Sequence, residues 1–208
     1  MKRVAYIFGI GVVVIAIGVL VLGGDDKKRS PIWDYMPRAI SAVFGPKPVK
    51  EFAMIDHNMQ SVTHETYTGK YLLTFFGYTY CPDVCPTGLS DISQALDILG
   101  PNAEKIIPVF VTVDPNRDTP EILKEYLENF HPKFVGLTGT KAQIDTLAKI
   151  YKARYVKMKT EDDDPGTYYM GHTSTIFLTG PDQQLITSYN RDVKPEAMAL
   201  SLKSILLR

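Results

Sequence analysis

Residues 71–86 read YLLTFFGYTYCPDVCP, an apolar run followed at once by two cysteines. The run at 71–78 is nearly continuous in apolar side chains, which is typical of a strand buried on both faces of a sheet. The next segment, TGLSDISQALDILG at 87–100, repeats leucine and isoleucine at spacings of three and four and ends in glycine, which predicts a helix with a C-terminal stop. This stretch therefore predicts a strand, a loop carrying Cys81 and Cys85, and a helix.

The remainder of residues 49–208 continues this alternation of strands and helices. A second buried strand is predicted at 106–113 (IIPVFVTV), followed by a helix capped by Thr119 with Pro120 in its first turn. Thr140 is predicted to cap another helix. Strands at 173–178 and 185–189 flank the turn GPDQ, and a helix closes the chain. We therefore predict an α/β domain of thioredoxin-like layout, with one central sheet and helices on both faces.

The N-terminal region differs in composition from this domain. Residues 4–22 carry no charge and have the length of a helix that spans the ~30 Å apolar core of a bilayer. No small-x-small cleavage site follows them, which favours a retained transmembrane helix over a signal peptide. We predict a membrane anchor at 1–24, a tether with four prolines at 25–48, and the thioredoxin-like domain at 49–208.

The charges beside the apolar segment do not predict on which side of the membrane the domain lies. Lys and Arg residues lie on both sides of the apolar segment, so they do not fix its orientation. The chain has no Arg- and Ser-rich transit segment, which favours a bacterial inner membrane over a mitochondrial one. We predict a single-pass protein whose soluble domain lies in the periplasm, on the oxidising side of that membrane. The chain holds 23 acidic and 23 Lys or Arg residues, a balance that gives no reason to expect nucleic acid as a partner.

The two cysteines leave three uses open: a disulfide, a redox pair or part of a metal site. They are placed at the carboxyl end of a strand and, because Pro86 puts the start of the helix near Cys85, at a helix N-terminus. This position favours thiolates, so both sulfurs are expected to be nucleophilic and good metal donors. A disulfide across so short a loop would add little stability, and the spacing does not match haem attachment. Thiol-disulfide exchange remains an alternative, although its usual spacing is two residues.

Four segments together resemble the Sco/SenC family: FGYTYCPDVCP, VFVTVDPNRDTP, YLENFHPKFVGLTG and GHTSTIFLTGPDQ. Members of that family are membrane-anchored copper-binding proteins that help to assemble cytochrome c oxidase. The resemblance covers roughly residues 45–207, and it implies that Cys81, Cys85 and His172 bind one copper ion. One position departs from the family, which often has Asp directly before the histidine, where this chain has Gly171.

The sequence also gives a physical reason to single out His172. His57, His64 and His131 are expected to be surface or packing residues. His172 instead leads into the strand predicted at 173–178, and the loop entering that strand faces the cysteine loop in a thioredoxin-like sheet. Thiol exchangers usually place a cis-proline there, and this sequence has no proline nearby. Two thiolates and one imidazole suit copper, because sulfur favours the cuprous ion and nitrogen helps to hold the cupric ion.

Two aspartates, Asp83 and Asp114, are expected near the predicted site, but neither is assigned as a ligand. Asp114, at the end of the second strand, is interpreted either as a partner or weak ligand beside His172, or as a turn-forming residue before Pro115. Asp83, between the cysteines, is expected only to cap the loop.

The sequence leaves more than one function open. The first hypothesis is a metallochaperone that passes copper to the binuclear site of cytochrome c oxidase subunit II, with other copper carriers as further partners. The second is a thiol-disulfide oxidoreductase that reduces the copper-site cysteines of that subunit, and the third is a copper- or redox-responsive signalling protein. We expect a monomeric soluble domain and assign no catalytic residue.

Overall fold

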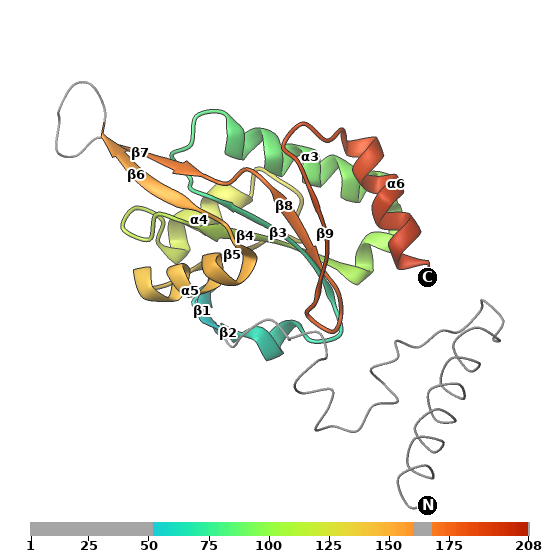
Figure 1. The fold of residues 1–208 in the computed structure, drawn as a ribbon, viewed down its shortest axis with the longest axis horizontal. Helices are drawn as coiled ribbons and strands as arrows, with labels where there is room; N and C mark the ends of the chain where they lie inside the picture. Colours follow the sequence, from blue (N-terminus) through green and yellow to red (C-terminus); the bar gives the residue numbers. More distant parts are fainter. Residues whose placement is uncertain (1–51, 160–167, 208) are drawn as a thin grey trace, which may run out of the picture. The chain divides into compact units, whose positions relative to one another are not determined.

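The computed structural model describes residues 52–159 and 168–207, which form a mixed α/β domain (Figure 1). Seven strands form one sheet in the order β2-β1-β5-β4-β3-β8-β9. The bounds of these strands are Ala53–Asp56 (β1), Ser61–Thr63 (β2), Tyr71–Gly77 (β3), Ile106–Thr112 (β4), Val135–Thr138 (β5), Ile176–Thr179 (β8) and Leu185–Tyr189 (β9). The helices are α3 (Val84–Leu99), α4 (Pro120–Leu127), α5 (Lys141–Tyr151) and α6 (Pro195–Leu206), with short 3-10 helices at His64–Tyr67 and Gly100–Lys105.

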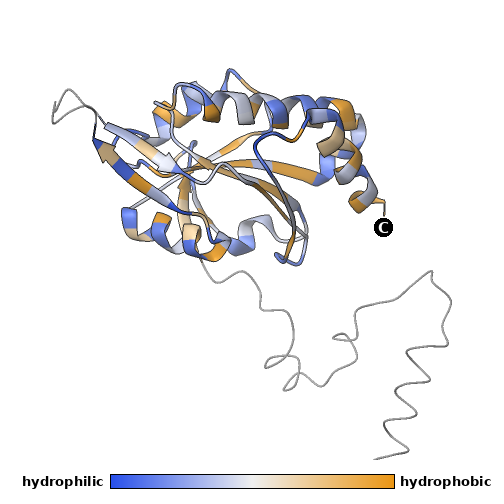
Figure 2. Cartoon of the chain, turned by 45° about the horizontal axis from the view of Figure 1, so that its top comes forward, coloured by the Kyte–Doolittle hydropathy of each residue, from blue (hydrophilic) through white to orange (hydrophobic). Residues whose placement is uncertain are grey.

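The central strand β3 shows how the helices cover the sheet. Successive side chains of a strand point to opposite faces, so Phe75 and Phe76 pack against different helices. Phe75 lies against α3 at Gly88, whereas Phe76 packs edge-on against Tyr151 of α5, with ring centroids 5.5 Å apart. In Figure 1, α3 and α6 lie together on one face and α5 lies on the other. Figure 2 shows hydrophobic strands between helices that carry both hydrophilic and hydrophobic residues.

Strand β3 owes its position to pairing on both of its edges. It runs parallel to β4, with Phe75 opposite Phe110, and antiparallel to β8, with Phe75 opposite Ile176. All but the first of its residues are buried, as the apolar run predicts. The carboxyl ends of β3 and β4 therefore meet at one edge of the sheet, where the cysteine loop and the loop after β4 both begin.

A separate two-stranded sheet projects beyond the main one. Its strands are β6 (Tyr155–Lys159) and β7 (Tyr168–His172), which pair antiparallel with Tyr155 opposite His172. Neither strand is hydrogen-bonded into the seven-stranded sheet. In Figure 1 this hairpin extends away from the body of the domain.

The predicted α/β architecture with helices on both faces of a central sheet is confirmed. The caps at Thr119 and Thr140 are also confirmed, because their hydroxyls accept from the backbone N–H groups of Ile122 and Gln143. The strand predicted at 173–178 begins only at Ile176, because His172 still pairs within β7. Strands β1, β2, β5, β6 and β7 were not predicted from the sequence pattern.

The predicted anchor at 1–24 and tether at 25–48 lie outside the described residues. Within the described ranges, none of the helices combines the length and the hydrophobicity that crossing a bilayer requires.

Candidate metal centre

The two cysteines lie where β3 gives way to α3. The helix begins at Val84, which places Cys85 in its first turn and Cys81 in the preceding loop, as Pro86 predicts. Cys85 is fully buried and Cys81 is partly exposed. The backbone N–H of Cys85 donates to the Sγ of Cys81 at 3.4 Å. A backbone N–H group at the N-terminus of α3 thus donates to the sulfur of Cys81, the partly exposed cysteine.

His172 approaches the cysteines from the other side, at the end of β7. Its Nε2 lies 3.3 Å from the Sγ of Cys85, and its Nδ1 lies 3.1 Å from the carbonyl oxygen of Thr173. When Nδ1–H donates to that carbonyl, Nε2 presents its lone pair to the sulfurs. The rings of Phe75 and Tyr78 contact the imidazole edge-on, at centroid distances of 6.1 and 5.9 Å.

The structure therefore brings together all three predicted ligand residues, although Cys85 and His172 lie 87 positions apart in the sequence. The two Sγ atoms and one imidazole nitrogen lie within 4.8 Å of one another. Three donors at this spacing fit one metal ion. Two sulfurs and one nitrogen suit copper, whereas a structural zinc site usually has four protein ligands.

The pKa values of the two thiols are shifted in opposite directions. The hydrogen bond from Cys85, supported by His172 and by backbone N–H groups of the helix start, lowers the pKa of Cys81 from 9.0 to about 3. The same pairing with Cys81, together with burial, raises the pKa of Cys85. The pair thus shares one proton and one negative charge at neutral pH. The lowered pKa of Cys81 agrees with the expected thiolate at the helix N-terminus, and the raised pKa of Cys85 favours its protonated form in the metal-free protein.

Gly77, which was not predicted as a site residue, lets α3 approach β3 at the site. A Cβ atom at this position would lie 2.6 Å from the Sγ of Cys85 and 2.7 Å from a ring carbon of Phe110. Such distances cannot be accommodated without moving the cysteine or the core. The available signal was a glycine at the end of an otherwise bulky apolar strand, directly before the cysteine loop.

Asp114 lies outside the Cys-Cys-His cluster, and its carboxylate makes other contacts. Its buried carboxylate accepts from Arg117 Nε and, at 2.8 Å, from the hydroxyl of Tyr168. Its carbonyl oxygen accepts from the N–H groups of Arg117 and Asp118, which agrees with the alternative interpretation as a turn-forming residue. Asp83 occupies the N-cap position of α3, but its side chain makes no capping hydrogen bond.

The other three histidines have local packing or hydrogen-bonding roles. Nδ1 of His57 accepts from the backbone N–H of Gly136 at 3.0 Å, and Nδ1 of His131 accepts from that of Lys133 at 3.3 Å. His64 packs edge-on against Phe52. This agrees with the prediction that they are surface or packing residues.

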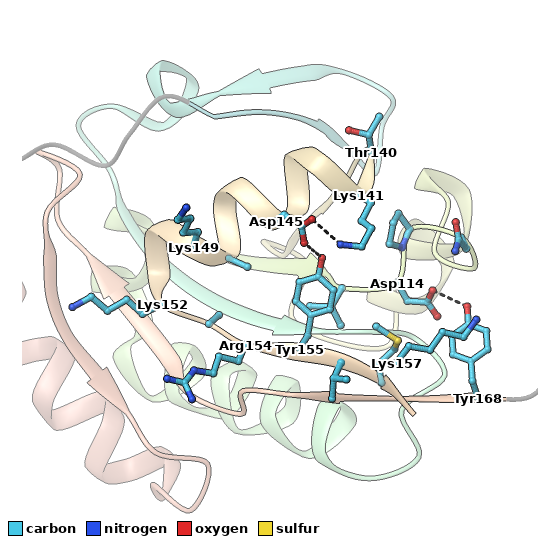
Figure 3. A pocket seen from close by; sticks show the side chains of 18 residues that line it. Asp114, Thr140, Lys141, Asp145, Lys149, Lys152, Arg154, Tyr155, Lys157 and Tyr168 are labelled. Atoms are coloured by element: carbon cyan, nitrogen blue, oxygen red, sulfur yellow. Dashed lines mark hydrogen bonds and ion pairs between the residues drawn. The ribbon is translucent and has the colours of Figure 1, made fainter. Parts of the chain in front are cut away.

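Two hollows lie near the hairpin. A shallow groove of about 470 Å³ runs beside His172 and is lined by Arg154, Tyr155, Val156, Gly171, His172 and Thr173. A larger cavity of about 1010 Å³ lies between the loop after β4, α5 and the hairpin (Figure 3). Its two carboxylates are already engaged: Asp145 contacts Lys141 and Tyr155, and Asp114 contacts Arg117 and Tyr168. Of the three candidate ligands, His172 lines the groove, and none lines the larger cavity.

A mixed sheet flanked by helices, with a Cys-Cys-His cluster at its edge, defines a thioredoxin-like domain with a candidate metal centre. A sequence profile described as SCO1/SenC matches residues 42–207. The SCO2-like protein of Rickettsia felis is 39% identical over 153 residues, which cover 74% of each chain. The mitochondrial SCO1 homolog of Homo sapiens is 35% identical over 204 residues, 97% of this chain and 65% of that protein. The chain therefore belongs to the SCO1/SenC family.

Solved structures show the same likeness. ScoI of Bradyrhizobium japonicum with copper bound is 40% identical and has a TM-score of 0.69, with 76% of this chain and 99% of that chain covered. ScoI of Arabidopsis thaliana with copper bound is 32% identical and has a TM-score of 0.71, with 78% of this chain and all of that chain covered.

Proposed function

We propose that this chain is a copper metallochaperone that binds one copper ion through Cys81, Cys85 and His172. It passes the ion to the binuclear copper site of cytochrome c oxidase subunit II during assembly. The observation that carries this proposal is the convergence of two sulfurs and one imidazole nitrogen within 4.8 Å. Membership in the SCO1/SenC family, and the copper-bound ScoI structures similar to it, give independent support.

The site suits an ion that is held and then released. Cys81 is partly exposed, and the groove beside His172 is open to solvent, so a donor atom of a client can reach the site. Copper is the cargo here, and ligand exchange moves it without any change in the chain's covalent structure. The lowered pKa of Cys81 keeps one thiolate ready for the ion, whereas Cys85 releases its proton when copper binds.

The uncharged segment at 4–22 supports a location that fits this role. We propose that it anchors the chain in a bacterial inner membrane and that the domain faces the periplasm, where it meets subunit II and other copper carriers. The domain is proposed to act as a monomer.

A second candidate is a thiol-disulfide oxidoreductase acting on the copper-site cysteines of the same subunit. It is favoured by one observation: a partly exposed thiolate at Cys81 lies next to a buried thiol at Cys85. Attack of Cys81 on a client disulfide would form a mixed disulfide. Cys85, once deprotonated, would resolve it, so that two electrons pass to the client and the chain becomes oxidised.

Replacement of His172 separates the two candidates. We expect His172→Ala to fold and to keep a reducible Cys81–Cys85 pair. Cupric binding should fall at least ~100-fold, and cuprous binding should fall less, because two sulfurs can still hold that ion. The measurements are competition titrations with both copper ions and the copper content of oxidase from cells that carry the variant. His131→Ala is the matched control and should behave as the parent.

The copper content of the oxidase decides between the chaperone and the oxidoreductase. Oxidase without copper in cells carrying His172→Ala supports the chaperone. Normal copper loading would exclude a chaperone role that depends on His172 and favour the oxidoreductase. Parent-like cupric affinity in the variant would refute His172 as a ligand.

A further inference from the structure

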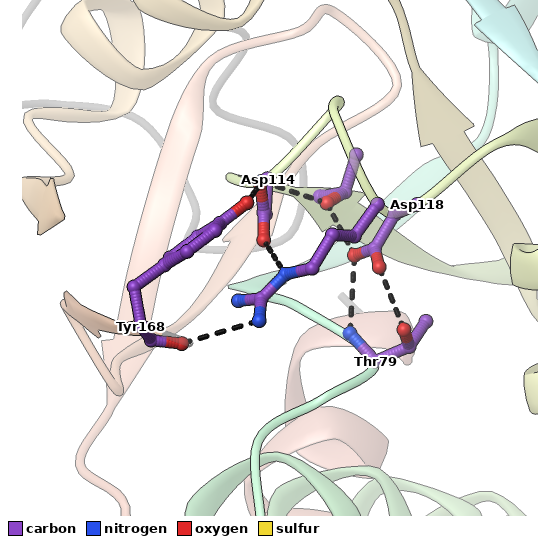
Figure 4. A network of polar contacts seen from close by, with 6 residues as sticks. Thr79, Asp114, Asp118 and Tyr168 are labelled. Atoms are coloured by element: carbon purple, nitrogen blue, oxygen red, sulfur yellow. Dashed lines mark hydrogen bonds and ion pairs between the residues drawn. The ribbon is translucent and has the colours of Figure 1, made fainter. Parts of the chain in front are cut away.

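The loop between β4 and α4 lies between the two segments that carry the candidate ligands. It contains Asp114, Arg117 and Asp118, and Figure 4 shows their polar contacts. None of these side chains belongs to the Cys-Cys-His cluster. Asp114 and Asp118 are nonetheless buried, with exposed fractions of 3% and 0%. Burial of two carboxylates so close together is costly unless each makes strong polar contacts.

Asp118 holds the loop that leads to the cysteines. Its carboxylate accepts from the backbone N–H of Thr79 at 3.0 Å and from the hydroxyl of Thr79 at 2.6 Å. It also accepts from the hydroxyl of Thr112 at 2.6 Å, on β4. Thr79 lies two residues before Cys81, so this carboxylate ties the start of the cysteine loop to the neighbouring strand.

Arg117 reaches in the opposite direction, to the hairpin. Its Nη1 donates to the carbonyl oxygen of Tyr168 at 3.1 Å, and its Cζ lies 3.7 Å from the centroid of that ring. Its Nε pairs with Asp114, whose other oxygen accepts from the Tyr168 hydroxyl. The latter contact is also visible in Figure 3. The first residue of β7 is therefore held through its backbone, its ring and its hydroxyl at once.

The same guanidinium also contacts the cysteine loop. Its Cζ lies 4.8 Å from the ring centroid of Tyr80 and 5.6 Å from that of Tyr78, both within the range of cation–π attraction. Tyr80 directly precedes Cys81, and Tyr168 lies four residues before His172. Arg117 thus contacts both ligand-bearing segments.

The hairpin needs such a contact because the main sheet does not fix it. Strands β6 and β7 form their own sheet, so no ladder of hydrogen bonds to β3 or β8 sets the position of His172. The backbone bond between Thr173 and Arg154, at 2.9 Å, joins the two strands to each other. Side-chain contacts must therefore orient the hairpin toward the cysteines.

We propose that Arg117 is a positioning residue that places His172 at the two cysteines by clamping Tyr168 of β7 to the cysteine loop. This inference rests on the proposed function only for its copper readout. An arginine is needed because its planar group stacks on a ring while it donates in two directions. A lysine keeps the charge beside Asp114 but cannot reproduce the stack and both hydrogen bonds.

The test compares Arg117→Lys with the parent and with Lys149→Ala, an exposed cation of α5 used as the matched control. The full-length, reduced, metal-free protein is first followed by hydrogen exchange. We expect faster exchange over 168–172 and unchanged exchange over 84–99. Cupric affinity should then fall about 10- to 100-fold, as is typical when a residue that orients a metal ligand is lost, and cuprous affinity should fall less.

Two results would overturn the proposal: parent-like exchange over 168–172, or equal losses for the two copper ions. If Arg117→Lys does not fold, Tyr168→Leu removes the ring and hydroxyl contacts of the clamp from the hairpin side and leaves the Arg117–Asp114 pair in place. It should give the same pattern, and a parent-like result would also overturn the proposal. If the parent bound no copper, the proposed function would fail, and the exchange data would still decide the role of Arg117.

Discussion

The two halves of the candidate metal centre are built in different ways. The cysteine half belongs to the core: β3 pairs on both edges, and Cys85 is fully buried under α3. The histidine half lies on a hairpin outside the main sheet, and Val156, Met158 and Tyr169 on that hairpin are at least half exposed. One half is thus fixed by backbone pairing and close packing, and the other by side-chain contacts.

This difference suggests separate tasks for the two halves. A site that must release its ion benefits when one ligand can withdraw without disturbing the others. Local opening costs least where buried contacts are few, which describes the hairpin and not α3. We therefore expect changes on the cysteine side to alter stability and all copper binding, and changes on the hairpin to alter mainly the part of binding that depends on His172.

The largest expected effect concerns the two thiols of the cysteine half. In the reduced, metal-free protein, iodoacetamide should modify Cys81 first, because that thiol is partly exposed and its pKa is lowered to about 3. A thiol of pKa 9.0 is only about 1% ionised at pH 7, so Cys81 holds roughly 100-fold more thiolate, although its lower basicity reduces part of the gain in rate.

The pH dependence of the alkylation rate distinguishes a thiolate from an ordinary thiol. Because Cys81 is already ionised, its alkylation rate should be nearly constant between about pH 5 and 8, where an ordinary thiol gains about tenfold per pH unit. Mass spectrometry of the labelled peptide measures this. In Cys81→Ser, Cys85 should react slowly at all these pH values, because its side chain is fully buried. A rate for Cys81 that rises tenfold per unit across this range would show that the helix start does not hold a thiolate there.

The same contrast explains which features were predictable from the sequence. Strands β3 and β4 were found because a strand buried on both faces is a continuous apolar run, and α3 because its apolar spacing is helical. Strands β1, β2 and β5 have four residues or fewer, too short for a clear pattern. The hairpin strands lie partly in solvent, so their residues lack such a run.

The three candidate ligands were predictable because their residue types are few and distinctive. The partners of Asp114 were not, because they depend on tertiary structure: Tyr168 lies 54 residues away in sequence, on a hairpin that was itself not predicted. Gly77 was missed for a similar reason, since only the packing of α3 on β3 shows why a side chain cannot fit there.

The second prediction probes the rigidity of the cysteine half. Gly77→Ala places a Cβ atom against the Sγ of Cys85 and the ring of Phe110, both in the core. Overpacking of this kind usually costs about 1–3 kcal/mol in the free energy of unfolding. Urea denaturation of the reduced, metal-free full-length protein measures it. We also expect weaker binding of both copper ions, since the displaced atom is a ligand. A parent-like midpoint would mean that the helix shifts freely on the sheet.

The smallest expected effect comes from the matching glycine of the hairpin, Gly171, where the family often has Asp. A Cβ atom here would lie 3.0 Å from the Sδ of Met158 and 3.2 Å from the Cγ1 of Val156. Both neighbours are more than half exposed, so they can move aside. Gly171→Ala should therefore change the free energy of unfolding by about 0.5 kcal/mol or less, as is usual for surface positions. Gly171→Ala should be measured beside Gly77→Ala under the same conditions. We expect its cuprous affinity to be unchanged. Its cupric affinity should change by no more than about twofold, because 0.5 kcal/mol corresponds to roughly that factor. A loss of stability as large as that of Gly77→Ala would show that the hairpin is packed as tightly as the core, and the division between the two halves would be wrong.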